Sequence, residues 1–234
     1  VEVAAQAREP RQRPVALDHR PIGWWPGEAD RENDDDLLDQ SGNGGHGFLI
    51  FPQEATYVPG LDGDALRLSS RAQVMIEDHP RYDCGSGTIA LWARPAYPWH
   101  EQAMAISKPI SLLTKMDWDG AAGYELLHAS GHPAEHWGGR VVLDRATRPS
   151  AVATMPPGTD WVHLAVTWGG GRLRFYQDGL LQSETPIPAR PVPGNDQHIT
   201  IGGNYAGLLD DIRLYDLALE PAEILALRLM HDGE

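Results

Sequence analysis

Residues Trp161–Leu227 decide the fold, and they contain WVHLAVTW (161–168), GGG (169–171), RLRFYQDG (172–179), ITIGG (199–203) and GLLDDIRLYDLALEPAEILAL (207–227). Every second residue of the first segment is apolar, which is the two-residue period of a half-buried antiparallel strand. The pair Asp178-Gly179 tolerates positive φ and suits a tight hairpin turn. Pro221 stands at a first-turn position, so Glu220 to Arg228 is expected to form a short helix with a structural role. The stretch therefore predicts consecutive hairpins followed by one helix.

Length and composition favour a single all-β domain. The chain has 234 residues, and β-sandwiches of about 200 to 250 residues fold as one unit. Its 25 glycines and 19 prolines suit a fold with many turns. No apolar run reaches the ~18 residues of a membrane span. A net charge of −14 argues against nucleic acid or an anionic membrane as partner.

The first twenty residues differ from the rest, because arginine and proline alternate there with little apolar bulk. We therefore expect residues 1–20 to be an extended arm and residues 21–234 to be the domain. The arm is interpreted either as a disordered leader or as a strap that lies along another protein. The one cysteine, Cys84, is expected to be a buried apolar residue without a disulfide partner. A single thiol is compatible with a bacterial periplasm or cell surface.

Three further segments carry a family resemblance: WWPGEADRENDDDLLDQSGNGGHGFLI (24–50), LDGDALRLSS (61–70) and GTIALWARP (87–95). Together with the C-terminal hairpins they resemble the laminin-G-like jelly roll of the concanavalin A-like lectin and glucanase superfamily, over roughly residues 22 to 228. The resemblance implies a sandwich of two antiparallel sheets in an extracytoplasmic (periplasmic, secreted or cell-surface) protein. It leaves the activity open, because the same sandwich hosts lectins, adhesion modules, glycosidases and lyases.

Carboxylates at two distant places suggest a structural calcium ion. The chain from Glu28 to Asp39 is strongly acidic, and a glycine-rich loop follows it. Strand parity places Asp210 on the same face as Ile212 and Leu214, where an unpaired carboxylate is costly. Calcium takes six to eight oxygen ligands. The alternative is a fully solvated acidic loop, with Asp210 satisfied by backbone N–H groups or by Arg213. The resemblance implies that the ion is held by the carboxylates of Glu28, Asp39 and Asp210 and by main-chain oxygens of Asn43 and His46.

Two patterns in the chain resemble catalytic motifs, but the residues around them do not suit catalysis. Glu28 to Glu32 spells the Glu-x-Asp-x-Glu of glucanases, but its surroundings predict a turn-rich loop rather than a core-facing strand. His128, His132 and His136 recur every fourth residue, but Gly131 and the proline that follows forbid the helix that would align them on zinc. The sequence therefore favours a protein that is not an enzyme.

Aromatic residues in polar, glycine-rich stretches give the strongest binding signal. Sugar rings stack on such side chains while neighbouring polar groups bind the hydroxyls. The alternative is that the aromatic rings only cap the edges of the sandwich. The predicted ligand is a glycan or glycoprotein. A second reading is an accessory subunit, docked through the arm and one sandwich face inside a larger extracytoplasmic assembly. The predicted binding residues are Trp99, Trp118, Tyr124, Trp137 and Arg140.

Overall fold

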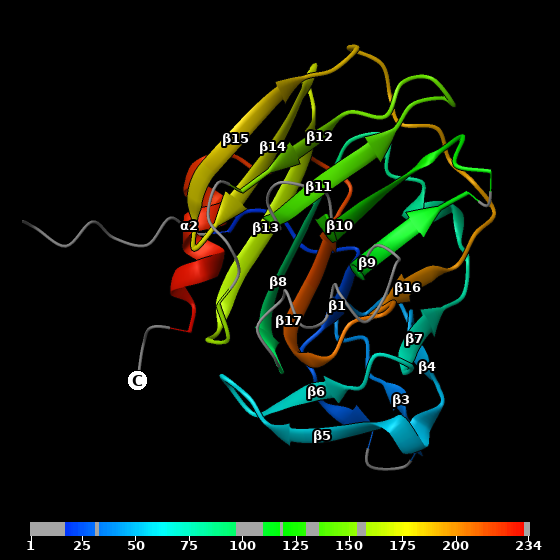
Figure 1. The fold of residues 1–234 in the computed structure, drawn as a ribbon, viewed down its shortest axis with the longest axis vertical. Helices are drawn as coiled ribbons and strands as arrows, with labels where there is room; N and C mark the ends of the chain where they lie inside the picture. Colours follow the sequence, from blue (N-terminus) through cyan, green and yellow to red (C-terminus); the bar gives the residue numbers. More distant parts are fainter. Residues whose placement is uncertain are drawn as a thin grey trace, which may run out of the picture.

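The computed structural model describes residues 17–30, 33–96, 110–117, 119–129, 136–153 and 158–231. The chain forms two antiparallel sheets stacked as a sandwich, with one helix near the C-terminus (Figure 1). The jelly-roll prediction is confirmed. Most of the predicted arm lies outside the described residues. Within the described part of the chain, no helix is long and apolar enough to cross a membrane.

The first sheet has eight described strands in the order β15-β14-β13-β8-β17-β6-β5, with β1 also paired to β17. Its long central strands β8 and β17 are buried along nearly their whole length. The strands are β1 (Gly23–Trp25), β5 (Ala55–Pro59), β6 (Asp64–Leu68), β8 (Gly87–Pro95), β13 (Val162–Gly169), β14 (Arg172–Gln177), β15 (Leu180–Pro186) and β17 (Gly207–Tyr215).

The second sheet has nine described strands in the order β12-β11-β10-β9-β16-β7-β4-β3-β2. Two short 3-10 helices, η1 (Pro52–Glu54) and η2 (Pro80–Tyr82), lie in the connections. The strands are β2 (Ala29–Asp30), β3 (Asn33–Leu37), β4 (Gly47–Ile50), β7 (Gln73–Ile76), β9 (Ile110–Met116), β10 (Gly123–Ala129), β11 (His136–Val142), β12 (Ser150–Val152) and β16 (Ile199–Ile201).

The hairpins at the centre of the sequence form as predicted. Asp178 and Gly179 connect β14 to β15 with φ of 51° and 77°, the left-handed conformations that a two-residue type I′ turn requires. Strand β13 pairs with both β14 and β8, and its side chains alternate between the two faces of the sheet. Trp168 and Phe175 from these strands are fully buried between the sheets.

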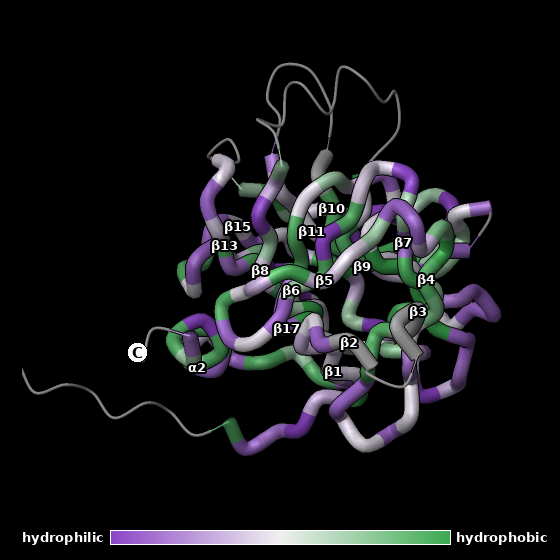
Figure 2. The backbone as a smooth tube through the Cα atoms, turned by 90° about the horizontal axis from the view of Figure 1, so that it is seen from below, coloured by the Kyte–Doolittle hydropathy of each residue, from purple (hydrophilic) through white to green (hydrophobic). Residues whose placement is uncertain are grey.

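The helix α2 (Pro221–Leu229) closes the outer face of the first sheet. Its N-terminus carries a capping box, in which Glu220 and Glu223 each accept a hydrogen bond from the other residue's backbone N–H. Ile224 and Leu227 are buried in a second apolar cluster. That cluster also contains the outward-facing residues Ala90, Ala165, Tyr176 and Tyr215 of the sheet. Figure 2 shows the helix at the periphery of the sandwich.

Candidate functional site

A single row of facing residues crosses the nine-stranded sheet. The row follows from the strand registers, in which each member lies directly opposite the next one. Because facing residues share one side of a sheet, all of these side chains project from the same surface. The members of the row are Phe48 in β4, Met75 in β7, Thr200 in β16, Thr114 in β9, Glu125 in β10, Arg140 in β11 and Ser150 in β12.

The row lies on the outer side of the sheet. A neighbouring ladder one residue away, which includes Val74, Ile201, Leu113 and Leu126, is fully buried in the core between the sheets. Successive residues of a strand point to opposite faces, so the row points away from the first sheet. Most members of the row are half-buried or exposed. We call this surface the outer row.

Glu125 is the exception, since it lies at the centre of the outer row and is only 3% exposed. Its carboxylate forms an ion pair with Arg140 on the adjacent strand and accepts a 3.5 Å hydrogen bond from Ser111 Oγ. Burial raises the pKa of Glu125 above its ordinary value, against the opposing effect of the Arg140 charge. Arg140 keeps about a third of its side chain exposed, and its buried Nε has no hydrogen-bond partner among the described residues. The pair therefore consists of a buried carboxylate and a guanidinium that reaches the surface.

The outer row does not supply a pair of carboxylates for glycoside hydrolysis. The next acidic position in its register is Asp36 in β3, five strands from Glu125. At about 4.8 Å per strand that is ~24 Å, whereas the two carboxylates of glycosidases lie about 5 to 9.5 Å apart. The chemistry available on the described strands of this face is hydrogen bonding and charge, with a mixture of hydroxyl and apolar neighbours.

Two predicted binding residues lie in the core instead of on the surface. Tyr124 is 2% exposed, stacks on Trp168 at 4.8 Å between ring centroids, and donates a hydrogen bond to the carbonyl of Tyr82. Trp137 is fully buried in the same core. The prediction that these rings are exposed is wrong, because their polar neighbours belong to strands β10 and β11 and face outward. Arg140 does lie on the outer face, and Trp99 and Trp118 lie outside the described residues.

Asp39 fixes the conformation of the glycine-rich loop through its own hydrogen bonds. Its carboxylate accepts hydrogen bonds from Trp24 N, Ser41 N, Ser41 Oγ and Gly45 N, at 2.8 to 3.0 Å. Burial raises the pKa of Asp39, but these hydrogen bonds outweigh it and hold the pKa below its usual value. The backbone N–H of Asp39 in turn donates to His46 Nδ1 at 3.1 Å. All of these contacts stay within the opening loop and β1.

Asn43 continues the same loop and is also occupied by protein contacts. Its carbonyl accepts a hydrogen bond from Arg81, and its Nδ2 donates to the carbonyl of Ile22 at 3.0 Å. The main-chain oxygen that the family resemblance assigns to calcium is therefore already paired with a guanidinium.

Asp210 and Glu28 meet at a different place, the turn between β5 and β6. Asp210 Oδ2 accepts from Leu61 N at 2.9 Å, and Glu28 Oε1 accepts from Asp64 N at 3.1 Å. Asp210 is 1% exposed, and burial raises its pKa to about 7. The five predicted ligands thus divide into two groups, Glu28 with Asp210 and Asp39 with Asn43 and His46. No group of three or more His, Cys, Asp or Glu side chains in the described part of the chain is placed to hold a metal ion.

The sequence did not indicate the network around Asp211. This carboxylate, with φ of 44° at a bulge in β17, accepts from Trp24 Nε1 and Arg213 Nε at 2.8 Å and lies 3.0 Å from His231 Nε2. Burial opposes ionisation, but these partners lower the pKa of Asp211 to about 2. The available signal was Arg213 two residues away, which pairs with Asp211 and not with Asp210.

Comparisons with known proteins give the same fold. One solved structure similar to the chain is the binding domain of paraclostridial mosquitocidal protein 1, with TM-score 0.72, 17% identity, and coverage of 92% of this chain and 53% of that one. Another is domain 4 of AbnA, an extracellular GH43 arabinanase from Geobacillus stearothermophilus, in complex with arabinotriose, with TM-score 0.67, 17% identity, and coverage of 89% and 98%.

The receptor binding domain of botulinum neurotoxin type G is similar as well, with TM-score 0.67, 13% identity, and coverage of 91% and 51%. The chain spans about half the length of the mosquitocidal and neurotoxin structures. No curated protein matches the sequence significantly. A family model described as the concanavalin A-like lectin/glucanases superfamily, of laminin G type, matches residues 68–225. The chain therefore belongs to the laminin G branch of the concanavalin A-like lectin and glucanase superfamily.

Proposed function

We propose that this protein is a non-catalytic recognition module that binds an uncharged glycan, free or on a glycoprotein, along the outer row. The observation that carries the proposal is the buried ion pair of Glu125 and Arg140 at the centre of an otherwise half-exposed face. The buried carboxylate holds the guanidinium of Arg140 in place, and the exposed part of that guanidinium can donate hydrogen bonds to sugar hydroxyls.

The charges on the outer row favour a neutral sugar over an acidic one. The carboxylate of Glu125 largely cancels the charge of Arg140, so a uronate would meet no net positive charge there. The exposed part of the Arg140 guanidinium and the hydroxyls of Thr114 and Thr200 still supply directional contacts. Binding sites of this kind combine apolar area with a few placed polar groups, and Met75 contributes the apolar area beside Thr200.

Structures of similar fold support a binding role. The domain of the arabinanase AbnA is in complex with arabinotriose, and one binding domain of botulinum neurotoxin DC is in complex with rat synaptotagmin II. These complexes support a carbohydrate- or protein-binding role for this chain. Since such domains act outside the cytoplasm in toxins and in an extracellular arabinanase, an extracytoplasmic location belongs to the same proposal.

The proposal keeps a structural calcium ion but assigns it fewer ligands. Glu28 and Asp210 both face the Gly60–Asp64 turn, and Asp210 is a buried carboxylate with only two amide donors. These two side chains would hold the ion, with main-chain oxygens of the turn, and the ion would supply charge compensation for Asp210. Asp39, Asn43 and His46 are engaged elsewhere and are left out of this ligand set.

The test is glycan binding by the wild type and by Glu125→Gln. Wild-type protein should bind at least one neutral polysaccharide on a panel of neutral and acidic glycans, and the variant should bind it at least about ten-fold more weakly, because a charged hydrogen bond is lost. Glu184→Gln is the matched control, since Glu184 forms an exposed ion pair with Arg172 on the other sheet. Equal affinity of all three proteins, or no binding by the wild type, would refute the proposal.

A second function, that of a docked accessory subunit, is favoured by one observation. An apolar surface of exposed residues lies around α2 and the β14–β15 hairpin, where Leu17 also packs. A Cβ at Gly179 of the hairpin would lie 2.8 Å from Leu225 Cδ1, so the hairpin packs closely against α2. If this surface docks a partner protein, replacing Leu180 and Met230 by serine should abolish co-purification of that partner while Glu125→Gln leaves it intact. The exposed apolar residues are Leu180, Leu181, Leu225, Leu229 and Met230.

A further inference from the structure

A small pocket lies at one end of the outer row. It has a volume of about 210 Å3 and is enclosed by the loop before β4 and by the segment from β7 to η2. Phe48, the terminal member of the outer row, forms part of its wall and is 45% exposed. The pocket therefore continues the surface that carries Glu125 and Arg140. It is large enough for about one sugar ring and is smaller than the ~300 Å3 of a drug-sized site.

Tyr82 places an unsatisfied hydroxyl beside this pocket. The residue is 1% exposed, and its OH has no hydrogen-bond partner among the described residues. The OH faces Gly45 so closely that a Cβ at Gly45 would lie 2.0 Å from it, and both residues line the pocket. Burial, reinforced by the charge of Asp39, raises the pKa of Tyr82, so the hydroxyl keeps its proton. A buried hydroxyl without a partner is costly and rare, and a ligand oxygen would remove the cost once the Gly45 backbone that covers the hydroxyl moves aside.

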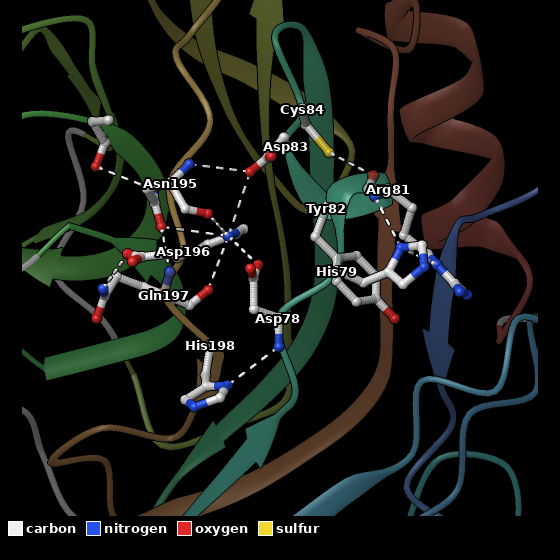
Figure 3. Close-up of polar contacts among 12 residues, drawn as sticks. Asp78, His79, Arg81, Tyr82, Asp83, Cys84, Asn195, Asp196, Gln197 and His198 are labelled. Atoms are coloured by element: carbon white, nitrogen blue, oxygen red, sulfur yellow. Dashed lines mark hydrogen bonds and ion pairs between the residues drawn. The ribbon is translucent and has the colours of Figure 1, made fainter.

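Two histidines add N–H donors at the mouth of the pocket. His46 Nδ1 accepts from Asp39 N, and His79 Nδ1 accepts from Arg81 N and Nε at 3.0 to 3.1 Å. In each neutral ring the proton is therefore on Nε2, which becomes a donor toward the outside. Figure 3 shows His79 beside the ring of Tyr82, with Arg81 holding the imidazole from the other side. The pocket thus combines donors, one buried hydroxyl and the ring of Phe48.

We propose that this pocket is a terminal subsite that binds one ring at the end of a glycan chain lying across the outer row. The inference rests on the proposed glycan-binding function and adds the direction and the minimum length of the chain. From β4 to β10 there are four strand steps, so Phe48 and Glu125 are ~19 Å apart across the sheet. A short saccharide can contact one of the two places, whereas a longer chain contacts both. Two linked contacts on one ligand raise its affinity strongly.

The experiment is a length series of neutral saccharides. Arabino-, cello- and malto-oligosaccharides, from monosaccharide to octasaccharide, are titrated into the wild type and into Tyr82→Phe, Phe48→Ala and Glu125→Gln by isothermal calorimetry. For the series that binds, we expect wild-type affinity to rise at least about ten-fold once the chain can span the ~19 Å between Phe48 and Glu125. Phe48→Ala and Tyr82→Phe should each remove most of that rise while leaving the affinity for short chains unchanged. Phe51→Ala, an exposed phenylalanine outside the pocket, is the control for Phe48.

The outcomes separate the two proposals. If Glu125→Gln abolishes binding but Phe48→Ala and Tyr82→Phe keep the wild-type length dependence, the subsite is refuted and the glycan function stands. If Tyr82→Phe changes only the melting temperature and leaves binding unaltered, its hydroxyl takes no part in binding and the subsite is again refuted. If no oligosaccharide binds the wild type, the proposed function fails. The subsite rests on that function and fails with it.

Discussion

His163 should make the protein lose stability in mild acid. This side chain is 2% exposed, its Nδ1 has no hydrogen-bond partner in the described structure, and its ring lies edge-on to Trp92 at 5.3 Å. Burial lowers the pKa of His163 to about 3, against a small opposing effect of Asp211. In the unfolded chain the same histidine has a pKa near 6.5. Below pH 6.5 the unfolded state binds a proton at His163 that the folded state does not bind. The contribution of His163 to stability is therefore complete above pH 6.5 and is lost as the pH falls toward 3.

The magnitude follows from the two pKa values. Between pH 7 and pH 5 this one group should lower the free energy of unfolding by about 2 kcal/mol, and each further pH unit should remove about 1.4 kcal/mol until the folded histidine titrates. Asp210 acts in the opposite sense, because its pKa is raised on folding. The wild type alone therefore gives only the sum, and the measurement must compare it with a variant in which position 163 does not titrate.

The assay is urea denaturation at several pH values for the wild type, His163→Phe and His163→Leu, where the second variant covers the case that phenylalanine overpacks the site. Between pH 7 and pH 5 the free energy of unfolding of each variant should rise by about 2 kcal/mol relative to that of the wild type. His198→Gln, at an exposed histidine, should keep the wild-type dependence. If the variants and the wild type have parallel stability curves over this range, the reasoning from burial is refuted.

Three other predictions concern stability. Lys115→Met should cost about 3 to 5 kcal/mol in urea denaturation, because the 1% exposed ammonium of Lys115 contacts Asp78 and the carbonyls of Asn195 and Gln197 at 2.6 to 2.9 Å. The control Arg145→Met removes an exposed ion pair and should cost under about 1 kcal/mol; equal losses would contradict the prediction. Gly139→Ala should cost about 1 to 3 kcal/mol, since its Cβ would lie 2.1 Å from Val166, whereas Gly158→Ala should be nearly neutral. Asp210→Asn should abolish any rise of melting temperature with added calcium, and it should also lower the stability of the calcium-free protein, because its NH2 group replaces one of the two oxygens that accept from Leu61 N and Asp211 N; a variant that still responds to calcium would exclude Asp210 as a ligand.

Local patterns were enough to predict the hairpins and the helix. The alternation in β13, the Asp178-Gly179 turn and Pro221 before the helix each act within a few residues, and the structure keeps all three. Alternation predicted that Asp210 shares a face with Ile212 and Leu214, and this is wrong. Asp210 is buried, but it pairs with Trp92 on the outer face of the sheet, while its neighbour Leu209 faces the core. The bulge between Asp210 and Arg213 interrupts the two-residue period, so alternation could not predict this.

The errors at Tyr124 and Trp137 have one physical cause. Polar and glycine-rich neighbours were interpreted as a loop, but in β10 and β11 those neighbours are the outward-facing half of two strands. A half-buried strand and a surface loop contain similar residues, and only the pairing partners separate them. Glu125 was missed for the same reason, because its burial depends on Arg140 and Ser111, which lie on other strands.

The outer row could not be derived from the sequence at all, because its members come from seven strands whose order is not sequential. Thr200 in β16 stands between Met75 in β7 and Thr114 in β9, and a shift of one residue in either pairing would turn the hydroxyl into the core. That register is fixed by the inner ladder, in which Val74, Ile201 and Leu113 pack against the first sheet.

Of the two outer faces of the sandwich, helix α2 covers the first sheet and packs on Ala90 and Ala165, which removes that part of its face from any ligand. Among the described residues, no helix covers the second sheet in this way, and its outward residues are polar or half-exposed. The proposed binding face is the one that carries Glu125, Arg140 and Phe48, so mutations there should alter binding while mutations beneath α2 should alter stability.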